Sequence, residues 1–216
     1  MSIEFDLGRR ALLAGVGGMA CAAAFSSRAR ADDAAQPAYI ELEGHMKPLE
    51  FHMEDVETGK TITEAAFHGH PVILYFGFTR CPDTCPLTMQ NAARLVQMLG
   101  ADGQKLRVAF VTVDLDYDTP ARLKDFMAKF GPPPVFTGLR GSPAELAAMA
   151  KRYGVYYKAP TGPDSPDPES AIGHSDATYL FAPDGKAIAL LPALPTSQPE
   201  LPKVAALVRK TIAGAL

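Results

Sequence analysis

The sequence predicts an α/β fold in which helices cover both faces of a small sheet. Two apolar runs, at residues 72–76 and 106–113, are each followed by a helical pattern, and this order is typical of strand–helix–strand units. A Pro-Asp-Gly turn at residues 183–185 predicts a β-hairpin before a closing helix. With 216 residues, of which 47% are hydrophobic and 21% charged, the chain suits one globular domain with additions.

The first 31 residues predict an export signal. The pair Arg9-Arg10 precedes an uncharged stretch at residues 11–25, and Ala29-Arg30-Ala31 resembles a cleavage site. The paired arginines favour a Tat-like address, and we expect the segment 1–31 to be cleaved. The alternatives are an uncleaved anchor, although the stretch is short against the ~20 residues that span a bilayer, and a lipoprotein signal ending at Cys21. The sequence therefore predicts a periplasmic protein, or one retained at the inner membrane by an uncleaved N-terminal segment.

The segment at residues 32–44 is interpreted as a linker to a domain that spans residues 45–216. Residues 49–53 and 60–63 flank a Glu-Thr-Gly turn, which predicts a β-hairpin extension at the N-terminus of the domain. The run at residues 72–76 lacks any alternation of polar and apolar side chains. It therefore indicates a strand buried on both faces.

The remaining elements are predicted from start and stop signals along the chain. A helix is expected from Pro86 until Gly100, a strand at residues 106–113, and a second helix from Thr119-Pro120. A capping box with proline at residues 142–145 starts a third helix. The other segments are a short connection beginning at Phe136, a weak strand at 156–158, an irregular excursion at 159–169, strands at 175–181 and 187–191, and a last helix at about 199–213. A thioredoxin-like three-layer sandwich fits this order best.

The charge balance argues against nucleic acid as a partner. The formal net charge is −3 at pH 7, and the expected export signal holds more basic than acidic residues, so the remaining chain is more acidic still. Cleavage would also remove Cys21 and leave Cys81 and Cys85 as the remaining thiols in an oxidising compartment. Two cysteines so close in the chain cannot join distant segments. Metal ligation and thiol exchange are therefore the roles to weigh.

Cys81 and Cys85 lie at the carboxyl end of a core strand, where open α/β sheets place their ligands. Each is followed by a proline, and the α conformation is disfavoured for a residue before proline. We therefore expect neither cysteine inside the helix, which should begin at Pro86, and an irregular loop that brings the thiols together. The amides of the first helical turn would favour the thiolate forms, which metal ligation and disulfide exchange both require.

Two thiolates with one imidazole indicate copper rather than zinc. A structural zinc site normally needs four protein ligands, whereas Cu(I) is soft and selects thiolates. Among the five histidines, His174 is the best-placed third ligand, between the excursion and a predicted strand; the alternative is an ordinary surface-loop histidine. The pairs His45-Met46 and His52-Met53 offer further soft ligands, but we interpret them as strand or linker positions without metal.

Asp114, Asp116 and Asp118 resemble the start of a calcium-binding loop. Thr119 stands where an EF-hand needs glycine, so we exclude calcium binding. Asp118 is expected to help cap the helix that follows, and the other two carboxylates to form a solvated strand end.

Three segments together resemble the Sco/SenC family of copper chaperones, which are assembly factors for cytochrome c oxidase. They are residues 76–86 (FGFTRCPDTCP), residues 113–120 (VDLDYDTP), and Gly173-His174-Ser175 followed by residues 179–185 (YLFAPDG). The similarity covers about residues 49–191. Two positions depart from the family's usual pattern: Gly173 stands where an acidic residue is common, and Leu115 where a proline is common.

The resemblance implies that Cys81, Cys85 and His174 are copper ligands in a thioredoxin-like domain that faces the periplasm. The bound ion would be Cu(I) or Cu(II). The resemblance also implies that the protein delivers copper to the dinuclear copper centre of cytochrome c oxidase, or prepares the thiols of that centre. The implied partners are the copper-bearing subunit of the oxidase and other periplasmic copper chaperones, with the protein itself a monomer.

The alternative from another functional class is a thiol-disulfide oxidoreductase that acts on exported or oxidase cysteines, with Cys81 and Cys85 as its redox-active pair. The CxxC spacing of thioredoxins is absent, and no proline immediately precedes Ser175, where such enzymes usually carry a cis-proline. A weaker alternative is a peroxidase whose thiolate would be activated by Thr79 and Arg80.

Overall fold

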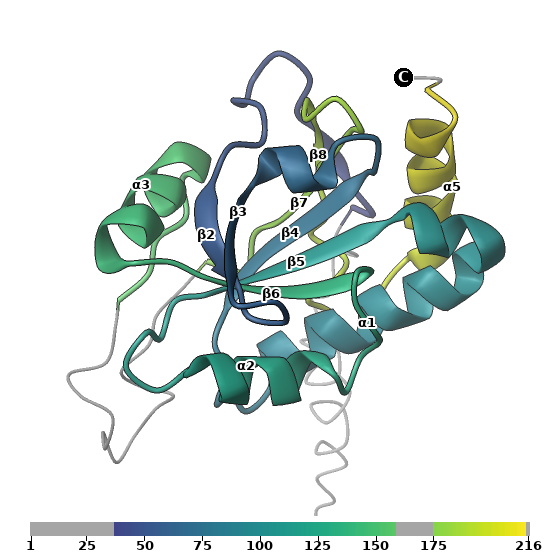
Figure 1. Ribbon diagram of the computed structural model, residues 1–216. Helices are drawn as coiled ribbons and strands as arrows, with labels where there is room; N and C mark the ends of the chain where they lie inside the picture. The colour runs from purple at the N-terminus through teal and green to yellow at the C-terminus, as the bar shows by residue number, and fades with distance from the viewer. Residues whose placement is uncertain (1–36, 159–174, 215–216) are drawn as a thin grey trace, which may run out of the picture. The chain divides into compact units, whose positions relative to one another are not determined.

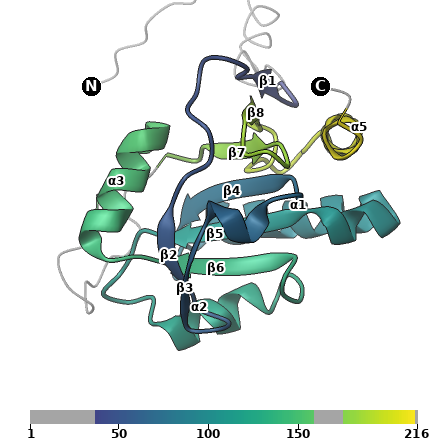
Figure 2. The same ribbon diagram turned by 45° about the horizontal axis from the view of Figure 1, so that its top comes forward.

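The computed structural model describes residues 37–158 and 175–214, which belong to one compact unit, Gln36–Leu216 (Figure 1). The described strands are β1 (Ile40–Glu41), β2 (His52–Asp55), β3 (Lys60–Thr63), β4 (Val72–Gly77), β5 (Arg107–Thr112), β6 (Phe136–Arg140), β7 (Thr178–Phe181) and β8 (Ala187–Leu190). They form one mixed sheet in the order β1-β8-β7-β4-β5-β6-β2-β3, whose central strands lie side by side in Figure 2. The neighbours β4, β5 and β6 run parallel, and the other pairs are antiparallel.

Helices cover one face of the sheet through an aromatic layer. The described helices are α1 (Thr84–Leu99), α2 (Pro120–Met127), α3 (Pro143–Tyr153) and α5 (Leu201–Ile212), with 3₁₀ turns η1 (Glu64–Phe67) and η2 (Gly100–Lys105). The ring centroids of Tyr75 and Phe110 lie 5.9 Å apart, and Phe110 lies 5.2 Å from Phe126 of α2. The Tyr75 hydroxyl reaches Cys85 of α1, and α1 packs against α5. This face is therefore covered by α1, α2 and α5.

The helix α3 covers the opposite face (Figure 1). Phe181 pairs with Val72, and because side chains alternate along β4, Val72 points away from the face of Tyr75. The ring of Tyr153 in α3 meets Phe181 edge-on at 5.5 Å, and the Tyr179 hydroxyl donates to the Tyr153 carbonyl at 2.8 Å. With apolar cover on both faces, every residue of β4 and β5 is buried. The predicted three-layer α/β sandwich is confirmed.

The helix starts follow the capping signals in the sequence. Thr119 caps α2, since its hydroxyl accepts from the Arg122 amide at 3.3 Å. At α3 the Ser142 hydroxyl accepts from the Glu145 amide at 3.3 Å, while the Glu145 carboxylate accepts from the Ser142 amide at 2.7 Å. This is the predicted capping box, and Gly154 ends the helix in the left-handed conformation that glycine favours.

Two strands occupy segments for which the sequence predicts no strand. The predicted connection beginning at Phe136 is the strand β6, which pairs in parallel with β5. Part of the segment interpreted as a linker, residues 32–44, also joins the sheet: Ile40 pairs with Leu190, and Glu41 with Ala189. The ordered fold therefore begins before residue 45.

The predicted N-terminal hairpin is present and belongs to the main sheet. β2 and β3 pair from His52 with Thr63 to Asp55 with Lys60, and β2 also pairs with β6 through Glu54 and Asp55. The hairpin is thus one edge of the sheet. Toward the C-terminus, β7 and β8 form the second predicted hairpin around Pro183-Asp184-Gly185.

Within residues 37–158 and 175–214, none of the helices combines the length and the apolar character that crossing a bilayer requires. The predicted export signal, residues 1–31, lies outside the described residues.

Candidate metal centre

Cys81 and Cys85 lie together where the chain leaves β4 and enters α1. Cys85 is fully buried, whereas Cys81 in the preceding loop is partly exposed. The backbone amide of Cys85 donates a hydrogen bond to the Cys81 sulfur at 3.4 Å. The structure therefore brings the two thiols together, one facing outward and one held in the core.

The predicted start of the helix is wrong by two residues. α1 begins at Thr84 with Asp83 as its N-cap residue, so Cys85 lies inside the first helical turn. Proline is tolerated in that turn because its missing N–H would have no intrahelical acceptor, and this outweighs the restriction that Pro86 places on Cys85. The helix start, rather than an irregular loop alone, aims the Cys85 amide at the Cys81 sulfur.

Burial raises the pKa of the Cys85 thiol, and the neighbouring Cys81 adds to this through a hydrogen bond and its charge. We expected the helix amides to favour the thiolate, but desolvation outweighs them at this sulfur. A metal ion would reverse the balance, because a cation stabilises thiolate ligands and releases their protons. Cys85 is therefore a buried thiol whose proton can be released when a soft cation binds to its sulfur.

Tyr75 and Gly77 of β4 determine how the Cys85 sulfur is packed. The Tyr75 hydroxyl donates a hydrogen bond to the Cys85 sulfur at 3.5 Å, and the Tyr75 side chain is fully buried. A Cβ atom at Gly77 would lie 2.9 Å from that sulfur and 2.9 Å from the Phe110 ring, well inside van der Waals contact. A glycine here leaves room for the sulfur. No pattern in the sequence marks this hydroxyl, because a tyrosine within an apolar run is interpreted as a core residue.

The acidic segment after β5 is structural, and two predictions about it are wrong. Asp114 is fully buried rather than solvated, whereas Asp116 is exposed as predicted, and Asp118 is also fully buried. Asp118 accepts from the Thr79 amide at 3.0 Å and from the hydroxyls of Thr79 and Thr112, both at 2.5 Å, so Thr119 alone caps α2. These hydrogen bonds connect the loop that contains Cys81 with the loop that follows β5.

Arg80 forms the second link between these loops. Its Nε donates to Asp114 at 2.7 Å, and its guanidinium lies 4.6 Å from the centre of the Tyr117 ring. Since Thr79 and Arg80 are both engaged with buried carboxylates, the two groups that a peroxidase would aim at its thiolate are held elsewhere in this structure.

The predicted third ligand, His174, lies outside the described residues. The chain that follows it does approach the thiols. Thr178 of β7 pairs with Tyr75 of β4, so the start of β7 lies beside the end of β4 from which the cysteine loop departs. In addition, Thr84 of α1 and Asp176 line one pocket of about 400 Å³.

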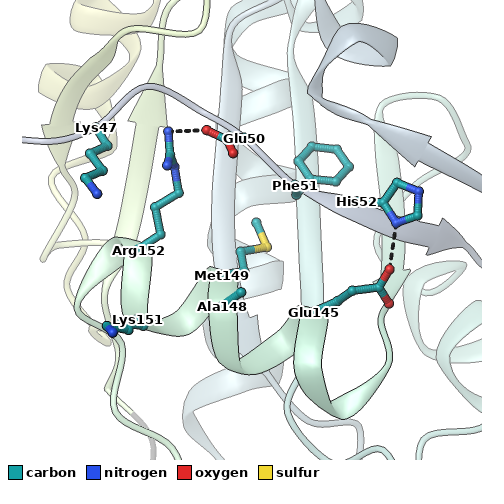
Figure 3. Close-up of a pocket in the computed structure, with 9 residues that line it drawn as sticks. All are labelled: Lys47, Glu50, Phe51, His52, Glu145, Ala148, Met149, Lys151 and Arg152. Atoms are coloured by element: carbon teal, nitrogen blue, oxygen red, sulfur yellow. Dashed lines mark hydrogen bonds and ion pairs between the residues drawn. The ribbon is translucent and has the colours of Figure 1, made fainter.

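Two of the other histidines are engaged away from the thiols. His52 lies in β2, and its Nδ1 meets the Glu145 carboxylate at 2.6 Å, in a pocket between α3 and residues 47–52 (Figure 3). His70 contacts the Lys105 carbonyl at 2.8 Å and Arg107 at 3.0 Å. Within the described part of the chain, no group of three or more His, Cys, Asp or Glu side chains could hold a metal ion. The two thiols thus need a ligand from elsewhere to complete a three-ligand site.

A three-layer sandwich with two thiols at the carboxyl end of a central strand defines a thioredoxin-like thiol protein. The comparisons with known proteins identify the particular group. The SCO1/SenC family model matches residues 47–209, and the chain belongs to this family.

Relatives and solved structures agree with this assignment. The mitochondrial SCO2 homolog of Bos taurus is 38% identical over 129 residues, which are 59% of this chain and 47% of the relative. The chain thus spans about half the length of the curated relatives it matches. The copper-bound structure of ScoI from Bradyrhizobium japonicum is similar with a TM-score of 0.63 and 30% identity, covering 76% of this chain and 98% of ScoI. Copper is also the metal that the sequence predicts.

A more distant structure shares the fold. BsSco, described as a member of the Sco family of cytochrome c oxidase assembly proteins with a disulfide switch, matches with a TM-score of 0.63 and 22% identity. The match covers 82% of this chain and 98% of BsSco. The predicted thioredoxin-like fold is confirmed by these structures.

Proposed function

We propose that this protein is a periplasmic copper chaperone that supplies the dinuclear copper centre of cytochrome c oxidase. The observation that carries the proposal is the paired arrangement of Cys81 and Cys85 at the start of α1, beside the start of β7. Copper is the cargo, and Cys81, Cys85 and His174 are the ligands that would hold it. The copper-bound relative ScoI and the oxidase-assembly description of BsSco support the choice of metal and acceptor.

The two sulfurs differ in a way that suits transfer of a metal. Cys81 is partly exposed, so a donor or acceptor protein can reach it by ligand exchange. Cys85 is buried, so its bond to the ion is shielded from water and from competing ligands. A chaperone needs both properties, since the ion must be held during transit and must then be released to a partner.

The first experiment is reconstitution of the reduced protein without residues 1–31 with Cu(I) and with Cu(II). We expect one copper per chain, loss of binding in Cys81→Ser and Cys85→Ser, and at least tenfold weaker binding in His174→Ala. His45→Ala, at an exposed position, is the matched control and should bind as the parent does. Absence of copper binding, or equal affinity in His174→Ala and the parent, would remove the chaperone proposal.

Export to the periplasm and the choice of acceptor need their own test. We expect the full chain to appear in the periplasmic fraction, and Arg9→Lys with Arg10→Lys to keep it in the cytoplasm if the Tat route is used. Copper-loaded protein should metallate the isolated copper-bearing domain of the oxidase. A protein found in the cytoplasm, or a loaded protein that transfers no copper, would contradict this assignment.

The second candidate function is a thiol-disulfide oxidoreductase. The observation that favours it is the pairing of one partly exposed and one buried thiol, because such enzymes attack with an accessible sulfur and resolve with a sheltered one. The disulfide switch described for BsSco points the same way. Turnover of oxidised oxidase cysteines by the reduced copper-free protein would establish it, and a rate no higher than that of free glutathione would exclude it.

A further inference from the structure

The buried hydroxyl of Tyr75 has a sulfur among its hydrogen-bond partners, and the side chain of Thr88 in α1 is another. The hydroxyl donates to the Cys85 sulfur at 3.5 Å from the strand below the cysteine loop. The Tyr75 ring is fully buried and packs against Phe110, so the hydroxyl is held beside this sulfur.

A hydrogen bond to a sulfur changes how that sulfur acts as a ligand. It withdraws electron density from a thiolate, and hydrogen bonding around a cysteine sulfur is one of the factors that set the redox potential of copper–thiolate sites. The backbone of Phe78 makes another hydrogen bond to Cys85 that acts in the same direction. Tyr75 supplies the side-chain share of this effect, which a substitution can remove.

We propose that Tyr75 is a positioning residue whose hydroxyl tunes the Cys85 sulfur, and thereby sets the balance between Cu(I) and Cu(II) and between dithiol and disulfide. The part of the inference that concerns Cu(I) and Cu(II) rests on the proposed function. The part that concerns the dithiol and the disulfide does not, because it involves only the chain's own sulfurs. Both parts predict that loss of the hydroxyl makes the Cys85 sulfur more electron-rich.

Tyr75→Phe is the direct test, since it keeps the ring against Phe110 and removes one oxygen. In the copper-loaded protein we expect the sulfur-to-Cu(II) charge-transfer band to move to longer wavelength. We also expect the ratio of Cu(II) to Cu(I) affinity to rise about three- to tenfold, which lowers the potential by ~30–60 mV for this one-electron couple.

The copper-free protein gives an independent measurement in a glutathione redox buffer. Cys81 and Cys85 pass two electrons and two protons to oxidised glutathione, which leaves as two reduced glutathione molecules while the Cys81–Cys85 bond forms. A disulfide sulfur accepts a hydrogen bond more weakly than a thiol or thiolate, so Tyr75→Phe should shift this equilibrium about three- to tenfold toward the disulfide.

Tyr179→Phe is the matched control. Tyr179 is also a buried tyrosine of the sheet, but its hydroxyl donates to the Tyr153 carbonyl on the opposite face. We expect a similar loss of thermal stability without a shift in either equilibrium. Incorporation of 3-fluorotyrosine at position 75 keeps the fold-supporting hydroxyl and makes it a stronger donor, so both shifts should reverse in sign.

Several outcomes would overturn the inference. Unchanged equilibria in Tyr75→Phe, equal shifts in Tyr179→Phe, or shifts of the same sign with 3-fluorotyrosine each reject a tuning role. Should Tyr75→Phe fail to fold, the fluorinated protein decides alone. Should the parent bind no copper, the proposed function fails, and the glutathione equilibrium still decides whether Tyr75 tunes Cys85.

Discussion

The hydroxyl and the backbone amide of Thr79 both donate to the carboxylate of Asp118, at 2.5 and 3.0 Å. Thr79 precedes Cys81 by two residues, whereas Asp118 comes from the loop between β5 and α2. One buried carboxylate therefore fixes the entry to the cysteine loop. With the pair of Arg80 and Asp114, it joins two loops at the carboxyl edge of the parallel strands.

Asp118→Ala should loosen the cysteine loop as well as destabilise the fold. The substitution leaves the Thr79 amide and two hydroxyls without their acceptor, and a buried donor left unpaired costs about 1–3 kcal/mol. We expect a loss of about 2–3 kcal/mol in urea unfolding, together with weaker copper binding.

Tyr153→Phe is the control for this loss. The Tyr153 hydroxyl also joins two distant segments, since it accepts from the Glu50 amide at 2.8 Å and donates to the Pro48 carbonyl at 3.0 Å. It should reduce stability without changing copper affinity. If both variants lower copper affinity equally, Asp118 has no specific role in holding the loop.

Burial raises the pKa of the Asp118 carboxyl above its ordinary value of 3.8, despite the hydrogen bonds from Thr112 and Thr79 that lower it. The folded state then holds this proton to higher pH than the unfolded state. The contribution of Asp118 to stability is therefore complete below about pH 4 and declines as the pH rises through the folded-state pKa. Asp118→Asn should remove that decline. If the stability–pH curves of the parent and Asp118→Asn run parallel above pH 4, the predicted decline of the Asp118 contribution with rising pH is wrong.

Glu145 predicts a pH dependence of the opposite sign. The hydrogen bond from His52, followed by those from Ser142, lowers the pKa of Glu145 from 4.5 to about 2. Its contribution is present above pH 4.5 and is lost as the pH falls toward 2. Because the carboxylate is partly exposed, we expect Glu145→Gln to lose only about 0.5–1 kcal/mol at pH 7, and nothing near pH 2.

Thr119→Ala separates this electrostatic effect from capping in general. Thr119 caps α2 with a hydroxyl, so its removal should reduce stability by about 1 kcal/mol at every pH. A pH-independent loss in Glu145→Gln, parallel to that of Thr119→Ala, would show that the Glu145 carboxylate contributes no charge effect.

The elements that the sequence predicts well are those whose signals are local. β4 and β5 are apolar runs that lie between two helical layers, and the capping box at Ser142 needs only four residues. The sequence does not predict β6, because this strand is short, contains Thr137 and Gly138, and is defined by its pairing with β5 and β2. Short strands of this kind are defined by their neighbours rather than by their own pattern.

In the candidate site, too, the features with local signals are predicted and those that depend on distant residues are not. The two cysteines are visible in the sequence, but the burial of Asp114 and Asp118 is not, because the residues that pair with them, Thr79 and Arg80, lie more than thirty positions earlier. A run of alternating aspartates therefore reads as a solvated turn. The role of the Tyr75 hydroxyl is not predictable from the sequence for the same reason, since its acceptor Cys85 comes near only when α1 packs on the sheet.

Gly77 and Gly138 allow the role of space around the sulfur to be isolated. A Cβ atom at Gly77 would lie 2.9 Å from the Cys85 sulfur, and one at Gly138 would lie 2.8 Å from Leu123 and 2.9 Å from Val56. Both glycines lie in buried strands of the same sheet, and only Gly77 borders a thiol.

Gly77→Ala should therefore impair copper binding beyond its effect on stability. Overpacking a filled core costs about 1–3 kcal/mol, and we expect a loss in this range for Gly77→Ala and Gly138→Ala alike in urea unfolding. In Gly77→Ala the added methyl group must displace the Cys85 sulfur or the Tyr75 ring, so copper affinity should fall at least tenfold and the charge-transfer spectrum should change. Gly138→Ala should bind copper as the parent does, because the added methyl group would meet Leu123 and Val56 rather than a thiol. Normal copper binding by a folded Gly77→Ala would show that the position of the Cys85 sulfur is not critical.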